Sequence, residues 1–420
     1  MIAQFRIHLL VICCILAGLL IGTAAAASLG IDWKERPPTD NSPFSGVMLN
    51  PDASVVYAGG NQMLVRSWDG NERWGGRSGW VAAMSTDGNH VVTALAKTVV
   101  SLDKDGIESW SRTMGGNIQA VAISANGSFV ISTDDLGHLN AWGPNGEFLG
   151  RNTNLTARKV AIAPTNDLVV ITTERGLVFY NPVLDLVWLD NRTSSFDFLS
   201  ADSFILITAD GSTVITAGAN QVASYTRTGV LNWRKEITTE PITDIACSAD
   251  GSAIIVGSKD KKVAALDRYG NVHWTFLDEQ WINAVGVSRD ASVIAVGGND
   301  HNLYILDHAG KLITRRQTDA IIQPRSIAVS ADGRRIVVAD QNLLYGYTLI
   351  PDPVVTEEQE TMTEVTTEPS ATETQVVTSP ATLLPVRTTI PLATTTPQSP
   401  AIAVSGIGAV AVVALLTRKR

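Results

Sequence analysis

The 420-residue sequence predicts an all-β ring built from repeated four-stranded units. The clearest unit contains four short runs with strand character, at 242–248, 253–258, 263–267 and 271–276. Ala249-Asp250-Gly251, Lys259-Asp260-Lys261 and Arg268-Tyr269-Gly270 separate these runs, and Asp and Gly favour the tight turns of an antiparallel meander. A single meander of four strands cannot bury both of its faces, so repeated copies must stack against one another.

A regular spacing of turn residues gives the number of units. The first turn of each unit contains an Asp or Asn that recurs about every 40 residues, a period typical of propeller blades. These residues are Asp52, Asp87, Asn126, Asn166, Asp210, Asp250, Asp290 and Asp332. Asp202 is a second candidate in the fifth unit, and we choose Asp210 because its distance to Gly229 matches the other units. Eight copies predict an eight-bladed β-propeller over residues 28–350, with seven blades as the alternative.

A second signature, D-x-x-G-x-x-x-W, marks the start of the outer strands. Complete copies occupy residues 103–110 and 267–274, and other units keep part of the pattern. Gly permits a tight turn into the outer strand, while Trp places a large apolar area toward the neighbouring blade. We predict a structural, inter-blade role for Trp33, Trp74, Trp110, Trp188, Trp233 and Trp274.

The last unit reaches Pro351 without an outer strand. A candidate for the missing strand lies at the other end of the chain, because residues 29–35 resemble residues 230–236. We expect a strand around Trp33 to complete the final blade and close the ring, which removes an open sheet edge.

Residues 1–27 are predicted to form a signal peptide. Arg6 supplies the positive charge, residues 9–21 the apolar segment, and residues 23–27 the small side chains of a cleavage site. An uncleaved N-terminal anchor is the alternative. Cleavage removes Cys13 and Cys14, so Cys247 would be the only cysteine left and no intrachain disulfide could form.

The C-terminal part changes composition at Pro351. Residues 351–400 are rich in Thr, Pro and Glu, which predicts an extended stalk, either O-glycosylated or a plain disordered linker. Residues 401–416 are predicted to form a transmembrane helix, and residues 417–420 a basic cytoplasmic tail. This order predicts a single-pass protein of the cell membrane with an extracellular propeller.

Two parts of the repeat resemble known families. The pattern over residues 265–274 resembles the tryptophan-docking motif of quinoprotein-like (PQQ-like) eight-bladed propellers, and residues 248–260 resemble WD repeats. The whole arrangement resembles archaeal surface proteins with a C-terminal sorting signal. In redox quinoproteins the cofactor depends on a vicinal disulfide, a calcium site and a basic residue in the central funnel. The only adjacent cysteines, Cys13 and Cys14, lie in the predicted signal peptide, so we predict no cofactor.

The sequence contains no pattern that indicates catalysis. It has no H-E-x-x-H, G-x-S-x-G, Walker-type loop or paired-cysteine zinc spacing. His301 falls in a hairpin turn, and we predict no metal site. The turn Asp residues recur for folding reasons, so we predict no catalytic residue. The net charge of −9 argues against a nucleic-acid partner.

These observations favour a non-enzymatic, monomeric surface module that binds protein or glycan partners. An exported quinoprotein-type oxidoreductase and an envelope assembly scaffold are the alternatives. Three sequons suggest N-glycosylation of the surface, at Asn126, Asn154 and Asn191.

Overall fold

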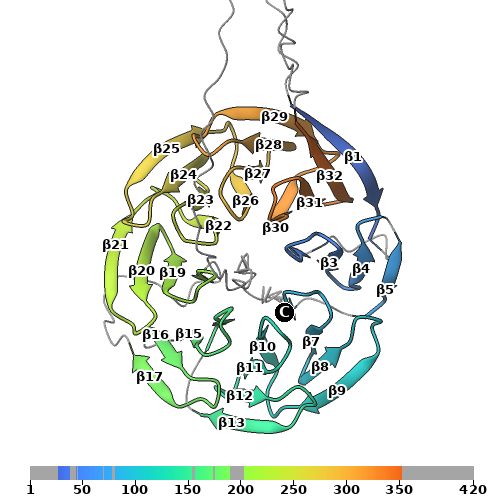
Figure 1. The fold of residues 1–420 in the computed structure, drawn as a ribbon, viewed down its shortest axis with the longest axis vertical. Helices are drawn as coiled ribbons and strands as arrows, with labels where there is room; N and C mark the ends of the chain where they lie inside the picture. The colour runs from blue at the N-terminus through green and yellow to red at the C-terminus, as the bar shows by residue number, and fades with distance from the viewer. Residues whose placement is uncertain are drawn as a thin grey trace, which may run out of the picture. The chain divides into compact units, whose positions relative to one another are not determined.

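The computed structural model is an antiparallel β-propeller whose eight four-stranded blades surround one central axis (Figure 1). It describes residues 27–37, 44, 46–69, 71–77, 81–153, 157–173, 176–189 and 203–351. Within these ranges every regular element is a strand. The eight sheets confirm the eight-bladed prediction over the seven-bladed alternative.

In blades 1 to 7 the strands follow one another from the centre of the ring to its rim (Figure 1). Blades 1 to 4 consist of β2 (Gly46–Leu49), β3 (Val55–Gly59), β4 (Leu64–Ser67), β5 (Glu72–Gly75), β6 (Ala82–Met84), β7 (Val91–Leu95), β8 (Thr98–Leu102), β9 (Glu108–Thr113), β10 (Ile118–Ile123), β11 (Val130–Asp134), β12 (Leu139–Trp142), β13 (Phe148–Asn152), β14 (Lys159–Ile162), β15 (Val169–Thr173), β16 (Gly176–Tyr180) and β17 (Leu186–Leu189).

Blades 5 to 8 complete the ring. Blades 5 to 7 consist of β18 (Phe204–Ile207), β19 (Thr213–Gly218), β20 (Gln221–Thr226), β21 (Leu231–Glu236), β22 (Ile242–Cys247), β23 (Ile254–Ser258), β24 (Lys262–Leu266), β25 (Val272–Leu277), β26 (Ile282–Val287), β27 (Ile294–Gly298), β28 (Asn302–Leu306) and β29 (Leu312–Gln317). Blade 8 consists of β30 (Ile322–Val329), β31 (Arg335–Asp340), β32 (Leu344–Ile350) and β1 (Ser28–Glu35).

The first strand of the chain is the outermost strand of its last blade. β1 pairs antiparallel with β32, from Ser28 opposite Ile350 to Glu35 opposite Leu344. This is the place that the sequence analysis assigned to a strand around Trp33. Hydrogen bonds between the two ends of the domain therefore close the ring, in addition to packing between blades.

Buried apolar side chains fill the spaces between neighbouring blades. At one such interface Val47 and Val56 of blade 1 pack with Val337 and Leu344 of blade 8. The three inner strands of each blade are buried on both faces and consist of nearly continuous apolar runs, as sheets covered on both sides require. The outer strands instead combine exposed polar residues with one half-buried Trp, as in β21 and β25.

The first turn of each blade is held by its polar residues. In blade 6 the Ser248 hydroxyl and the Ser252 amide both donate to Asp250 Oδ1, at 2.8 and 3.0 Å. Gly251 follows Asp250 with φ of +67°. The same arrangement occurs at Asp210, the residue that we chose in blade 5.

Blade 4 departs from the predicted turn register. Thr165 occupies the position of the Asp, whereas Asn166 has φ of +62° and occupies the position of the Gly. The assignment of Asn166 to the Asp position is therefore wrong by one residue. Asn is one of the few residues that adopt the left-handed conformation readily, so its two possible roles in a turn look alike in the sequence.

Hydrogen bonds join the first turns of neighbouring blades at six of the eight seams. At five seams the amide of the residue before the turn Asp or Asn donates to the backbone carbonyl of the equivalent residue in the next blade, at 2.8 to 3.1 Å. The pairs are Thr86–Ala125, Ala209–Ala249, Ala249–Arg289, Arg289–Ala331 and Ala331–Pro51. At a sixth seam the Ala125 amide donates to Asn166 Oδ1 at 2.9 Å. Pro51 and Pro164 occupy the donor position at the other two seams and have no N–H to give.

The predicted signal peptide (1–27, apart from Ala27), stalk (351–400, apart from Pro351), transmembrane helix (401–416) and tail (417–420) lie outside the described residues. They remain predictions. No helix long and apolar enough to cross a membrane occurs in the part of the chain that the structure describes.

Candidate functional site

Tryptophans of the outer strands lie at the seams between blades. At four seams the indole Nε1–H donates to a backbone carbonyl of the next blade: Trp74 to Lys104 (3.1 Å), Trp110 to Pro144 (2.9 Å), Trp233 to Arg268 (2.7 Å) and Trp274 to His308 (2.9 Å). Each acceptor stands two residues before the Gly of that turn. The indole also lies against this Gly, so that a Cβ on Gly270 would be 2.7 Å from Trp233. Trp188 lies against Gly229 in the same way.

The closing seam between blades 8 and 1 is built differently. Trp68 stands at the acceptor position, and the buried Trp33 Nε1 has no hydrogen-bond partner among the described residues. The hydrogen bond runs in the opposite direction, because Trp68 Nε1 donates to Asp32 Oδ2 on β1 at 2.9 Å. The two indoles meet edge to face, with ring centroids 5.6 Å apart.

Arg66 of blade 1 makes two further contacts across this seam. Its side chain is only 4% exposed, it forms an ion pair with Glu35 of β1, and its guanidinium lies 4.0 Å from the centroid of the Trp33 ring. A buried charge that loses its partner costs about 3–5 kcal/mol, so Arg66 depends on β1 being in place. Charge and aromatic contacts therefore add to the β1–β32 ladder.

A groove of about 640 Å³ opens beside these indoles. We call it the closing-seam groove, and it is lined by Asp32, Trp33, Asp52, Trp68, Asp69, Asp332, Arg334, Arg335 and Thr348. A groove at the seam of blades 6 and 7 has about 350 Å³ and a more apolar wall that includes Trp274. A third groove, of about 600 Å³, is lined by the first turns of blades 5 to 8 and includes Asp210, Asp250, Arg289 and Asp290. The closing-seam groove differs from this one in its two indoles.

Side chains on one wall of the closing-seam groove are held in place by one another. Asp32 Oδ2 accepts hydrogen bonds from Trp68 Nε1 and from the Thr348 hydroxyl, the latter at 2.5 Å. Arg335 donates to the Ala53 carbonyl at 3.4 Å, and its guanidinium lies 5.2 Å from the centroid of the Trp68 ring. The wall therefore has a defined shape before any ligand arrives.

Two turn carboxylates that also line the groove accept hydrogen bonds through one oxygen each. Asp332 Oδ1 accepts from the Ser330 hydroxyl at 2.6 Å and from the Arg334 amide at 3.0 Å. Burial opposes ionisation of Asp332, but these hydrogen bonds and the nearby arginines lower its pKa. Asp52 Oδ1 accepts from the Ser54 amide at 3.0 Å. Among the described residues, the hydrogen bonds to Asp52 and Asp332 use Oδ1 alone.

The inner strands of the blades carry a second charged site. The inner strand β30 bulges between Ile322 and Ile327, and within this bulge Arg325 has φ of +59°. Its guanidinium lies 4.5 Å from the ring centroid of Phe204 in blade 5, so the side chain reaches across the ring. Asp244 is buried nearby, and burial raises its pKa to about 7 against the opposing effects of the Val285 amide and Arg325.

This central site does not fit pyrroloquinoline quinone. Of the three features that the quinoprotein resemblance implies, the described ring has only the basic residue, Arg325. Cys247 is its single cysteine and is buried, with its thiol pKa raised to about 12 by burial. In the described ranges no group of three His, Cys, Asp or Glu residues could hold a metal ion.

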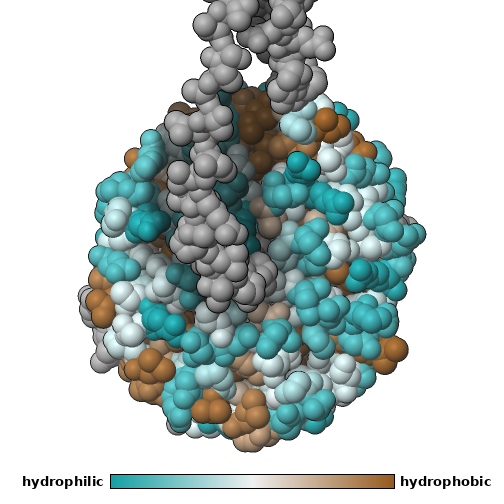
Figure 2. Space-filling view, viewed as in Figure 1, coloured by the Kyte–Doolittle hydropathy of each residue, from teal (hydrophilic) through white to brown (hydrophobic). Residues whose placement is uncertain are grey.

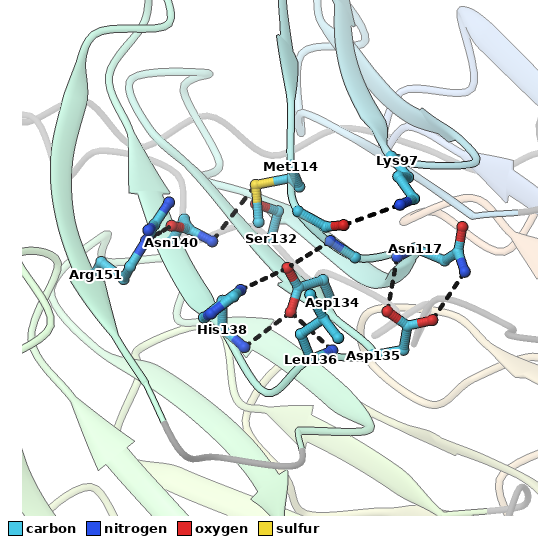
Figure 3. A network of polar contacts seen from close by, with 12 residues as sticks. Lys97, Met114, Asn117, Ser132, Asp134, Asp135, Leu136, His138, Asn140 and Arg151 are labelled. Atoms are coloured by element: carbon cyan, nitrogen blue, oxygen red, sulfur yellow. Dashed lines mark hydrogen bonds and ion pairs between the residues drawn. The ribbon is translucent and has the colours of Figure 1, made fainter.

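A polar network in blade 3 contains an Asp–His pair (Figure 3). Asp134 Oδ2 lies 2.8 Å from His138 Nδ1 and accepts a hydrogen bond from the Gly116 amide at 3.3 Å. Burial works against the charge, but the His138 amide and ring lower the pKa of Asp134. The same contact to the preceding inter-blade loop recurs at Asp260 and Asp340. The recurrence indicates that this carboxylate anchors a loop.

The rim of blades 3 and 4 exposes a group of apolar side chains. We call it the rim patch, and it consists of Phe148, Leu149, Val183, Leu186, Val187 and Leu189. Figure 2 shows hydrophobic colour along the part of the rim where Figure 1 places β13 and β17. β13 lies close to the turn that precedes β17, because the Val183 carbonyl lies 2.8 Å from the position that a Cβ on Gly150 would take. β17 contains no charged residue, whereas β29 at the corresponding place carries Arg315 and Arg316.

Four further residues were singled out from the sequence. Asn126 stands in the first turn of blade 3, where its Oδ1 accepts from the Ser128 amide at 3.1 Å. Asn154 and Asn191 lie outside the described residues. His301 stands in the β27–β28 turn with φ of +62°. N-glycosylation of the three asparagines stays a prediction.

Comparison with known proteins supports the fold. The family model of the lambda-carrageenase beta-propeller domain matches residues 217–324, from the end of β19 into β30. The crystal structure of the C-terminal WD40 domain of Sif2 is similar, with a TM-score of 0.61 and 15% identity over 77% of this chain and 99% of that one. No match was found among curated proteins. At this identity the similarity confirms a WD-repeat-like propeller and concerns the fold alone.

Proposed function

We propose that this protein is a non-enzymatic interaction module of the cell surface that binds a protein partner through the rim patch. The observation that carries the proposal is the exposure of the patch: Phe148 is 56%, Leu186 59% and Val187 50% exposed. Contiguous apolar surface on a rigid scaffold is typical of protein contact sites. Full burial of an exposed side chain of this size contributes about 1.5–3 kcal/mol, and burial of the exposed half of these side chains contributes roughly half of that.

Cross-linking on intact cells tests this proposal. Cells that produce the full-length protein are treated with a membrane-impermeant cross-linker, and captured proteins are identified by mass spectrometry. We expect Leu186→Asp to lose a partner that the unmodified protein captures. Val272→Asp is the matched control. Val272 of β25 pairs with Leu266 as Leu186 of β17 pairs with Tyr180, and the Val272 side chain is 48% exposed. Equal capture by Leu186→Asp and the unmodified protein would contradict the proposal.

A glycan is a second class of partner. The match to the propeller domain of a carrageenase supports it, since that name refers to an enzyme that acts on a polysaccharide.

The proposal includes the cellular location of the protein. The signal-like residues 1–27, the Thr/Pro-rich residues 351–400 and the apolar residues 401–416 support an extracellular propeller anchored to the membrane. Protease added to intact cells should degrade the propeller and leave a small membrane-bound C-terminal fragment. Protection of the propeller until the cells are lysed would place it in the cytoplasm and refute this part.

A further inference from the structure

We propose that Asn145 is a site of spontaneous deamidation and that Asn126 is protected from the same reaction. Asn-Gly occurs twice in the sequence, at 126–127 and 145–146. In this dipeptide the backbone nitrogen of Gly can attack the side-chain carbonyl carbon of Asn, because Gly has no side chain to obstruct the approach. The N–Cγ bond forms, and the amide nitrogen leaves as ammonia together with the proton of the Gly N–H. Water then opens the cyclic imide at either carbonyl, which gives Asp or isoaspartate and replaces a neutral amide with a carboxylate.

The two dipeptides occupy turns with the same backbone geometry. The Gly amide donates to the carbonyl three residues earlier at 3.0 Å in both turns, from Gly127 to Ser124 and from Gly146 to Gly143. The φ angles of Gly127 and Gly146 are +71° and +73°, and the Asn before each Gly is exposed. Because the attacking nitrogen is held alike at the two sites, a difference in rate must come from the surroundings of the Asn side chains.

Hydrogen bonds fix only one of these two side chains. Asn126 Oδ1 accepts from the Ser124 hydroxyl and from the Ser128 amide, both at 3.1 Å. Ring closure requires the side chain to turn its Cγ toward the Gly nitrogen, which disrupts these bonds. Among the residues that the structure describes, the hydrogen bonds of Asn145 involve its backbone amide and carbonyl alone. The Asn145 side chain therefore reaches the reactive conformation at lower cost.

Deamidation at Asn145 would alter the seam between blades 2 and 3. The Pro144 carbonyl accepts from Trp110 Nε1 at 2.9 Å, and the Gly146 carbonyl accepts from Arg112 Nε at 2.7 Å. Isoaspartate carries the main chain through its side-chain carbon, which lengthens the chain between these two carbonyls. The spacing of the two acceptors then no longer matches the two donors on β9, so at least one of the hydrogen bonds should weaken.

The test follows both asparagines by mass spectrometry while the full-length protein, produced without N-glycans, ages in mildly alkaline buffer. Chymotrypsin cleaves after Phe129 and so places the two residues in different peptides. Protein unfolded in guanidinium chloride is the control, because neither side chain is then restrained. Relative to these unfolded rates, we expect Asn145 to react about tenfold faster than Asn126 in the folded protein, the effect of one or two hydrogen bonds on a barrier.

Three results would overturn the proposal. They are equal relative rates in the folded protein, faster reaction at Asn126, and no reaction at Asn145 over a period in which the unfolded protein reacts. The effect on the seam is measured on the isoaspartate form, which ion exchange separates from unmodified protein. Asn145→Asp is its matched control, because this variant has the added charge without the longer main chain. We expect the isoaspartate form to melt roughly 2–4 °C below Asn145→Asp, as the loss of one hydrogen bond predicts, and equal Tm values would refute the effect on the seam.

Discussion

At the scale of single residues, a glycine and a tryptophan from neighbouring blades meet at each ordinary seam. Gly106, Gly270 and Gly310 have φ of +73°, +74° and +78°, and the indole of the preceding blade lies against each of them. A side chain at these positions would strain the backbone and also overlap the indole. Each D-x-x-G-x-x-x-W signature therefore takes part in two seams. Its Gly contacts the Trp of the preceding blade, and its Trp contacts the Gly of the following blade.

Two glycine substitutions distinguish the cost of backbone strain from the cost of overlap with the indole. Gly76 has φ of +93° with nothing within 4 Å of an added Cβ, whereas a Cβ on Gly270 would be 2.7 Å from Trp233. We expect Gly76→Ala to lower the free energy of unfolding by about 1–2 kcal/mol through the backbone alone. Gly270→Ala should lose about 1–3 kcal/mol more through overpacking. Urea unfolding followed by Trp fluorescence measures both, and equal losses would show that the indole contact contributes nothing.

Asp244 should make stability depend on pH in an unusual direction. Burial raises its pKa in the folded protein to about 7 from an ordinary value of 3.8. Between these values the folded state holds a proton that the unfolded state has lost, so stability falls as pH rises through about 4 to 7 and is level above. We expect a loss on the order of a few kcal/mol over this window. Calorimetry from pH 4.5 to 8 should show a weaker dependence in Asp244→Asn, and identical profiles would refute this assignment.

At the scale of elements, β1 fastens the ring through two kinds of contact. Its backbone pairs with β32, while Asp32 and Glu35 bind Trp68 and Arg66 of blade 1. Deletion of residues 29–36 removes all of these contacts and leaves Arg66 buried without its partner. We expect Tm to fall by roughly 10 °C or more, since each kcal/mol shifts Tm by about 2–4 °C in domains of 150–250 residues. Ile31→Ala, at a side chain that is 40% exposed, is the control and should change Tm little. An unchanged Tm after the deletion would show that the ring does not need β1.

The strands could be predicted closely because turn residues mark their ends. In blade 6 the predicted segments 242–248 and 253–258 correspond to Ile242–Cys247 and Ile254–Ser258. The strand around Trp33 could be assigned from its likeness to residues 230–236. The reversed hydrogen bond from Trp68 to Asp32 could not, because it joins side chains that the repeat pattern does not pair. The one sequence signal for this hydrogen bond is Trp68 itself, because the equivalent position in other blades holds Lys104, Pro144, Arg268 or His308.

At the scale of the whole molecule, hydrogen bonds donated by backbone amides between successive turns connect the blades into two arcs. They run from blade 5 through blade 8 to blade 1, and the bonds at Thr86 and Ala125 join blades 2 to 4. Pro51 and Pro164 separate the two arcs. Side-chain contacts replace this bond at the seams between blades 1 and 2 and between blades 4 and 5. Examples are the hydrogen bond from Trp74 to the Lys104 carbonyl and the ion pair of Arg227 with Asp167.

Ala249→Pro tests the contribution of one such bond. Pro is accommodated at the same turn position in blades 1 and 4, so the backbone conformation should tolerate it. The change removes the hydrogen bond from the Ala249 amide to the Arg289 carbonyl, which is 2.9 Å long. We expect a net loss of about 1 kcal/mol, since the lost bond outweighs the entropy gained in the unfolded chain. Thermal unfolding measures the change, and a gain in stability would show that the bond is dispensable.

The two candidate sites were only partly visible in the sequence. Leu186 and Val187 belong to an outer strand without charged residues, whereas other outer strands, such as β21 and β29, carry several. This difference is the sequence signal for the rim patch. The closing-seam groove combines Asp32 and Trp68 with Arg334 and Arg335 from the far end of the chain. Only closure of the ring brings these residues together, so no local pattern marks them.

The pairing of Ser28 with Ile350 also makes the location of the chain break arbitrary. A short peptide from residue 350 to residue 28, with new termini in the inter-blade loop at 318–321, would give a circular permutant with the same blades. β32 and β1 would then be covalently joined, and all four strands of blade 8 would come from one contiguous segment. Because the groove depends on side chains rather than on the break, it should survive the permutation.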